Sequence, residues 1–94
     1  MTKIERKDDG KKGRFVIYEN DEFAGEMIYN WEGKSKIIIV HTQVEEKFGG
    51  KGFGKQLVLK SVEYARKNNL KIVSHCSYAK KVLESDDHFK DILG

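Results

Sequence analysis

A glycine-rich segment in the middle of the chain constrains the fold more than any other feature. Four glycines fall among the six residues Gly49-Gly50-Lys51-Gly52-Phe53-Gly54. Glycine costs about 1 kcal/mol relative to alanine inside a helix, so glycines at a helix start indicate that something approaches the backbone closely. Exposed N–H groups and the positive end of a helix dipole together favour an anion. We therefore interpret the segment as an anion site rather than as a linker or a simple tight turn.

The flanking residues place this segment between a buried strand and an amphipathic helix. The near-continuous apolar run over 36–44 is typical of a strand covered on both faces. Apolar residues recur at helical spacing over 52–68, and a short strand is expected over 71–76. Segments 14–20 and 23–30 predict a hairpin, and helical turns are expected over 78–84 and 88–93. These elements predict an α+β fold with a mixed, mostly antiparallel sheet and a right-handed strand–helix–strand unit over 36–76.

Length and composition narrow the class of protein. The 94 residues predict one domain spanning 1–94, with the basic residues 1–12 as a solvated, frayed arm. No apolar run reaches the roughly 18 residues of a membrane span and no secretory signal opens the chain, so we expect a cytoplasmic protein. The single cysteine excludes an internal disulfide, and without a Cys-x-x-Cys pair no metal is expected. A net charge of +3 argues against a nucleic-acid binder.

Two better-known phosphate-binding motifs fail on particular residues. The pattern Gly49-x-x-x-x-Gly54-Lys55 matches a nucleotide phosphate loop except at Gln56, where Ser or Thr must ligate magnesium. The dinucleotide pattern fails because the glycines lie at 50, 52 and 54, and no acidic residue near 70 is present to hold a ribose. Both kinds of nucleotide site are therefore disfavoured.

Residues 36–76 resemble the GNAT acetyltransferase superfamily. Its acetyl-coenzyme A motif runs from a strand through [Gln/Arg]-x-x-Gly-x-[Gly/Ala] into a long helix. Val44 lies five residues before Gly49, and Gly52 and Gly54 match the two small positions. Gly49 itself departs from the pattern, since most members have Arg or Gln there. The chain length and the later Cys-x-Tyr are similar to those of a small branch of single-domain GNAT-like proteins.

The resemblance implies a compact GNAT-like fold that binds acetyl-coenzyme A as the acetyl donor. The pantetheine arm would follow the strand backbone, and the pyrophosphate would meet the amides of the glycine turn. The helical pair that usually follows the first strand has no counterpart here, so the fold is expected to be truncated at the acceptor side. That leaves room for a protein acceptor or for the second subunit of a homodimer. The expected cofactor-binding residues are Thr42, Gln43, Val44, Gly49, Gly50, Lys51, Gly52, Phe53, Gly54 and Lys55.

Three residues are candidates for the chemistry. By the resemblance, Tyr78 would protonate the departing thiolate. The alternative is that its aromatic ring packs on the cofactor or on the core. His41 and Cys76 lie near the C-terminal ends of two predicted parallel strands, where α/β sheets place ligands. His41 would either activate Cys76 as an acetyl-carrying nucleophile or act directly as the base, with Cys76 lining the pantetheine channel. The alternative for each is a structural role, His41 as a histidine with satisfied hydrogen bonds and Cys76 as a small buried apolar residue.

Three functional hypotheses follow. The leading one is an N-acetyltransferase that moves an acetyl group from acetyl-coenzyme A to an amine of an unidentified small molecule or protein. The second is a coenzyme A-binding module without turnover, which senses acyl-coenzyme A. The third is a basic nucleic-acid interaction domain, for which the glycine turn would have no use.

Overall fold

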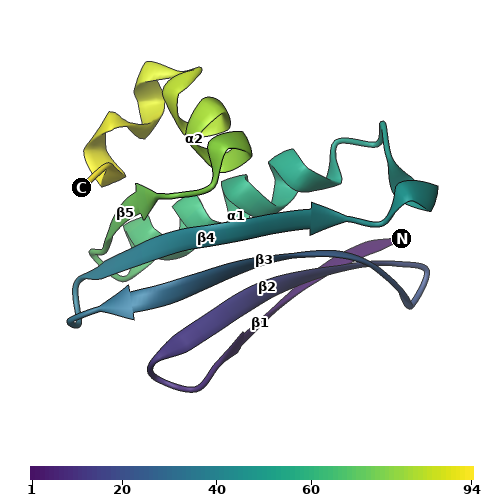
Figure 1. Cartoon of the computed structure of the whole chain (residues 1–94), viewed down its shortest axis with the longest axis horizontal. Coiled ribbons are helices and arrows are strands. Elements are labelled where there is room, and N and C mark those ends of the chain that lie inside the picture. The colour runs from purple at the N-terminus through teal and green to yellow at the C-terminus, as the bar shows by residue number, and fades with distance from the viewer.

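The computed structural model describes all 94 residues and contains one five-stranded sheet in the order β1-β2-β3-β4-β5 (Figure 1). The first four strands form an antiparallel meander, β1 (Thr2–Asp8), β2 (Lys12–Glu19), β3 (Glu22–Glu32) and β4 (Lys36–Val44). A crossover then leads to a parallel fifth strand through η1 (Glu46–Phe48), α1 (Phe53–Lys67) and β5 (Lys71–Ser74). The chain ends with α2 (Ser77–Glu84) and η2 (Asp87–Ile92). The α+β fold with a mixed, mostly antiparallel sheet is thus confirmed.

The expected elements hold with small changes of length. The strand expected over 71–76 ends at Ser74, because Cys76 already occupies the position before α2. The helical turns expected over 78–84 and 88–93 appear as α2 and η2. No helix has both the length and the apolar character that crossing a membrane requires.

The expectation of a frayed N-terminal arm is wrong, because residues 2–8 form β1 and pair along their whole length with β2. The Asp8 carboxylate holds this strand in place. It accepts hydrogen bonds from Tyr29 Oη at 2.5 Å and Trp31 Nε1 at 2.7 Å, and pairs with Arg6 at 3.1 Å. The Arg6 guanidinium in turn lies 4.4 Å from the ring centroid of Tyr64 on α1. A strand with little apolar character is therefore bound to both β3 and α1 by polar contacts.

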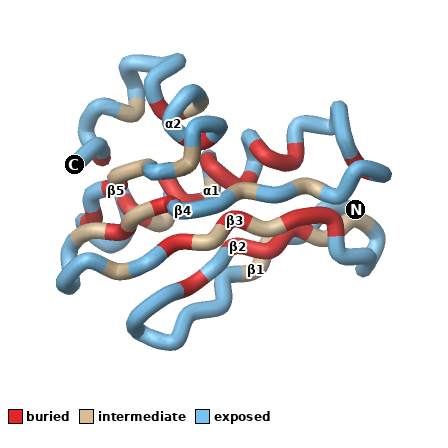
Figure 2. The backbone as a smooth tube through the Cα atoms, in the orientation of Figure 1, coloured by how far each residue is buried: buried red, intermediate tan, exposed pale blue.

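A single hydrophobic core lies between the helices and one face of the sheet. In Figure 2 the buried segments follow the central strands and the side of α1 that faces them. The core contains apolar side chains from α1, α2 and η2, packed against sheet residues that include Phe15, Met27, Tyr29, Ile37 and Ile39. In Figure 1, α1 lies behind β4 and no helix lies in front of the sheet. The sheet therefore has one covered face and one open face.

The connection between β1 and β2 explains why this face is open. The two strands are joined by a tight turn in which Asp9 Oδ1 accepts hydrogen bonds from the amides of Lys11 and Lys12, each at 2.9 Å. No helix stands between the strands. The helical pair that the resemblance places after the first strand is therefore missing, as predicted, and a hairpin takes its place.

Candidate functional site

β4 and β5 form a fork that opens toward the glycine turn. The two strands are in register only from Lys36↔Lys71 to Ile39↔Ser74, whereas β4 continues to Val44. The last hydrogen bond across the pair runs from the His75 amide to the Ile39 carbonyl, at 2.8 Å. Beyond this point the chain leaves β5 for α2, so the edge of β4 that faced β5 has no strand partner.

A β-bulge on β4 sets which groups face the fork. Ile28 pairs with His41 and Tyr29 with Ile39, so Val40 is an extra residue on β4 and is 37 % exposed. After the bulge, the Glu45 amide donates to Ala24 on β3. Because peptide groups alternate in direction along a strand, those of Thr42 and Val44 must face the fork. The peptide groups of Gln43, a predicted cofactor contact, face β3 instead.

The glycine turn presents a run of free amides beside this open edge. None of the N–H groups from Gly50 to Lys55 donates a hydrogen bond within the chain. Gly50 and Gly52 have φ values of +81° and +76°, a left-handed backbone that favours glycine. A Cβ on either would meet no other atom within 4 Å, so these two glycines serve the backbone conformation and leave space for a ligand.

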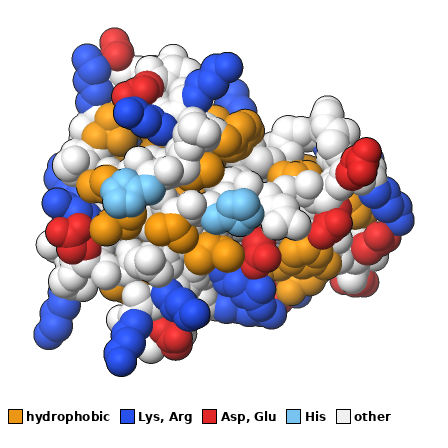
Figure 3. Space-filling view, in the orientation of Figure 1, with side chains coloured by type: hydrophobic (Ala, Val, Ile, Leu, Met, Phe, Trp, Pro, Cys, Tyr) orange, Lys and Arg blue, Asp and Glu red, His pale blue; other side chains and the backbone are white.

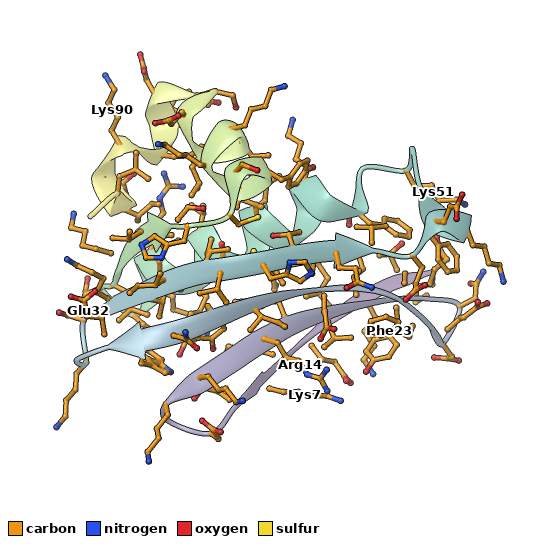
Figure 4. All side chains as sticks on the ribbon, viewed as in Figure 1. Lys7, Arg14, Phe23, Glu32, Lys51 and Lys90 are labelled. Atoms are coloured by element: carbon orange, nitrogen blue, oxygen red, sulfur yellow. The ribbon has the colours of Figure 1, made fainter.

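Aromatic and charged side chains complete the turn. Phe48, just before the glycines, and Phe53, at the first position of α1, are buried with ring centroids 5.9 Å apart and anchor the turn to the core. Lys51, at the outer tip of the turn in Figure 4, and Lys55 form no ion pair. Lys47, by contrast, is paired with a glutamate on β3 at 2.9 Å. Lys51 and Lys55 are therefore the lysines available to an anion bound at the turn.

Cys76 lies at the inner end of the fork. Its Sγ is 3.5 Å from Thr42 Oγ1, across the gap between β5 and β4. Burial opposes ionisation of the thiol, but the nearby backbone amides of Ala79 and Tyr78 at the start of α2, together with Thr42, lower the pKa of Cys76 below its ordinary value. The amides at the start of α2 thus make the Cys76 thiol more acidic than an ordinary cysteine.

Tyr78 connects α2 to the glycine turn. Its side chain is 44 % exposed and its ring lies over Gly54. A Cβ at Gly54 would lie only 3.0 Å from Cε2 and from Oη of this tyrosine. Gly54 therefore has a role that its motif position does not reveal, because the missing side chain lets Tyr78 lie against the start of α1.

His41 lies on the other face of β4. Its Nε2 is 3.3 Å from Gln43 Oε1, so these two side chains share a face, and the intervening Thr42 points into the fork toward Cys76. The structure does not bring His41 and Cys76 together, and activation of the thiol by this histidine has no geometric support. Figure 3 shows histidine side chains at the surface of the molecule, next to hydrophobic side chains. No group of three His, Cys, Asp or Glu residues is placed to hold a metal ion.

The free amides of the glycine turn, the edge of β4 without a strand partner and the thiol of Cys76 thus lie on the same side of β4. The model of the GCN5-related N-acetyltransferase family matches residues 14–92 of the chain. The chain belongs to this family. The GNAT resemblance expected from the glycine turn and its flanking elements is thereby confirmed.

Relatives of this GCN5-related chain agree with the assignment. The protein NATD1 of Danio rerio is 25 % identical over 88 residues, which cover 93 % of this chain and 80 % of that protein. A GCN5-like protein of Staphylococcus aureus, known from a solution structure, is 38 % identical with a TM-score of 0.71, over 96 % of this chain and 87 % of its own. A Bacillus subtilis acetyltransferase crystallised with CoA shares the fold, with a TM-score of 0.64 at 24 % identity, over 77 % of this chain and 63 % of its own.

Two features of this GCN5-related site have no signal in the sequence. The bulge at Val40 is a property of strand pairing and depends on β3 as much as on β4. The contact between Gly54 and Tyr78 joins residues 24 positions apart through the packing of α2 on α1. Both became visible only when the elements were assembled.

Proposed function

We propose that this chain binds acetyl-coenzyme A and transfers its acetyl group to an amine. The observation that carries the proposal is the continuity of the free amides of the glycine turn with the open edge of β4. Membership of the GCN5-related family supports it, as does the related fold crystallised with CoA. We take the chain to act as a single domain in the cytoplasm, where its lone thiol stays reduced.

Each part of the donor has a matching part of the site. The pyrophosphate would accept hydrogen bonds from the amides of residues 50–55, with Lys51 and Lys55 adding charge. The pantetheine arm would pair with the peptide groups of Thr42 and Val44 as an added strand would. The thioester would then lie near Cys76, at the inner end of the fork.

For direct transfer, the site offers an acid on one side of β4 and a base on the other. The amine nitrogen attacks the carbonyl carbon of the thioester, its C–N bond forms and the C–S bond breaks. His41, on the open face, accepts the proton from the amine, and Tyr78 gives a proton to the departing thiolate. Acid and base on opposite sides of the thioester suit this reaction, because the nucleophile and the leaving group are also on opposite sides.

Cys76 offers a second route through an acetyl-enzyme. Its thiolate would attack the same carbon, and coenzyme A would leave with a proton from Tyr78. The amine would then attack the acetyl carbon and release the Cys76 thiolate, and the proton of the amine would return to the Tyr78 oxygen. Intact mass after mixing with acetyl-coenzyme A separates the routes, because only the second adds an acetyl group to the chain. A Cys76→Ala variant with full turnover would assign the reaction to direct transfer.

Binding is tested by thermal unfolding with acetyl-coenzyme A. Ligand at a hundred times its dissociation constant should raise the free energy of unfolding by about 2.7 kcal/mol. Gly52→Val should abolish this ligand-dependent gain, because the new side chain would occupy the space in front of the free amides. Gly33→Val is the matched control, since Gly33 has a similar φ of +67° in an open turn between β3 and β4.

The control separates backbone strain from loss of the site. Both variants should lose stability without ligand, by roughly 1–2 kcal/mol for the left-handed backbone, but Gly33→Val should keep its full response to acetyl-coenzyme A. Equal responses in the two variants would reject the glycine turn as the anion site. If the chain binds acetyl-coenzyme A but releases no free coenzyme A in the presence of amines, it is a binding module and not an enzyme.

A further inference from the structure

Four side chains form a row across the open face of the sheet. Lys7 pairs in register with Arg14, Arg14 with Ile28, and Ile28 with His41. Residues directly opposite each other point to the same face, and none of the four belongs to the core. Neighbouring strands lie about 4.8 Å apart, so the row is about 14 Å long. Figure 4 shows Lys7 and Arg14 side by side at its outer end.

The outer end of this row lies in an open hollow of about 570 Å³. Three carboxylates line the hollow, and each already has partners within the chain. Asp8 binds the Tyr29 hydroxyl and the Trp31 indole, and Asp9 binds two amides of the β1–β2 turn. The third, the glutamate at position 26, is paired with Arg14 at 2.8 Å.

The lysines of the hollow have no such partners. Lys7 and Lys12 both line it, and neither forms an ion pair. Asp8 and the glutamate are each neutralised by an arginine, whereas Asp9 keeps its charge because its hydrogen-bond donors are uncharged amides. The two lysines outnumber this one carboxylate, so the charge left in the hollow is positive. The hollow is therefore suited to an anionic group such as a carboxylate.

The inner end of the row lies beside the fork. His41 is two residues past the last position of β4 that pairs with β5, next to the bulge at Val40. Ile28 lines the hollow and also pairs with His41, so it joins the two ends. A molecule on the open face can thus reach both the end of the fork and the free lysines.

We propose that the amine acceptor is an acidic polypeptide segment, lying across the open face with its amine at His41 and a carboxylate between Lys7 and Lys12. This inference rests on the proposed acetyl transfer. The distance of about 10 to 14 Å exceeds the reach of the carboxylate of a single amino acid. At about 3.3 Å per extended residue, it fits an acidic side chain on the third or fourth residue from the amine. The absence of a covering helix leaves room for a continuing chain.

Binding is measured first without acetyl-coenzyme A, so that it does not depend on turnover. The ¹⁵N-labelled protein is titrated with an unblocked hexapeptide carrying Glu at its third and fourth positions, and with the same peptide carrying Lys there. The acidic peptide should shift the amides of residues 7, 12–14 and 28, and the basic one should not. Equal effects of the two peptides, or shifts elsewhere, would overturn the proposal. The same shifts with free glutamate alone would show a general carboxylate site and would overturn the assignment to a polypeptide.

Charge reversal then tests the role in transfer. The double variant Lys7→Glu, Lys12→Glu should raise KM for the acidic peptide about tenfold, as expected for two lost surface pairs replaced by repulsion. It should leave kcat within about twofold and leave KM for acetyl-coenzyme A unchanged. The matched control Lys67→Glu, Lys81→Glu changes the total charge equally on two exposed helical lysines without ion pairs. An equal rise of KM in both variants would reduce the effect to net charge and reject the hollow.

The two proposals fail in different ways. If acetyl-coenzyme A does not stabilise the protein, acetyl transfer is rejected, whereas the peptide titration still reports on the hollow. If acetyl-coenzyme A binds and the acidic peptide does not, the acceptor assignment alone is rejected.

Discussion

The contact between Gly54 and Tyr78 predicts that a substitution at Gly54 changes catalytic activity, through the position of the Tyr78 hydroxyl, more than it changes the stability of the fold. In Gly54→Ala the new Cβ would lie 3.0 Å from Cε2 and Oη of Tyr78, so the ring must move by about 0.5 Å or more to reach ordinary van der Waals distance. The ring is 44 % exposed and can move outward. An off-rotamer side chain costs about 0.5–1.5 kcal/mol, while alanine in place of glycine in a helix gains about 1 kcal/mol. The two effects offset each other, so stability should change by less than about 1 kcal/mol.

Activity should respond far more strongly than stability. Displacement of a reacting group by about 1 Å can cost up to about a hundredfold in rate, and an acid contributes about a hundredfold or more. We therefore expect kcat to fall about tenfold in Gly54→Ala, with binding of acetyl-coenzyme A within threefold of the original. Steady-state release of coenzyme A measures the first quantity and calorimetric titration the second.

Tyr78→Phe provides the comparison, because it keeps the ring and removes only the hydroxyl. If Gly54 acts by placing that hydroxyl, the double variant should be no slower than Tyr78→Phe alone. Full activity of Gly54→Ala, or additive losses in the double variant, would refute the reasoning.

Three further predictions concern the edge strand β1 and the fork. Asp8→Ala leaves the buried Tyr29 hydroxyl without its acceptor. The free energy of unfolding, measured in urea, should therefore fall by about 2–3 kcal/mol. A loss under about 0.5 kcal/mol would contradict a role for Asp8 in anchoring β1. Burial opposes ionisation of Asp8, but hydrogen bonds from Tyr29, Gly10 and Trp31 hold its pKa below the ordinary value, so its stabilisation is present above about pH 4 and is lost as pH falls through the lower folded-state pKa. The pKa of Cys76 is lowered, so the rate at which iodoacetamide alkylates it should reach its midpoint at a lower pH than in an unfolded control. Mass spectrometry follows the alkylation. An equal or higher midpoint would contradict the stabilising effect of the α2 amides on the thiolate.

The central unit was predictable because its signals are local. The apolar run of β4, the helical spacing of α1 and the glycines between them each depend on residues close together in the sequence. The strand occupies residues 36–44 as expected, and the helix lies within one residue of its expected bounds. The free amides of the turn follow from the same local pattern, since a helix cannot satisfy its own first N–H groups.

The first strand was not predictable for the opposite reason. The sequence of β1 is Thr-Lys-Ile-Glu-Arg-Lys-Asp, with one apolar residue, and this is how exposed edge strands guard against unwanted pairing. Its stability comes from Asp8 and Arg6, whose partners Tyr29, Trp31 and Tyr64 are more than 20 residues away. Polar contacts of this kind leave no periodic pattern in a sequence.

The sequence by itself determined that a glycine turn would join a buried strand to a helix and present free amides. It also placed His41 and Cys76 at the same end of two parallel strands. Only the tertiary structure decided which face each side chain takes. The extra residue at Val40 reverses the alternation of β4, so that Thr42 meets Cys76 in the fork and His41 points to the open face. Side chains in a strand alternate with a period of two, and a bulge on one strand of a pair reverses every face beyond it.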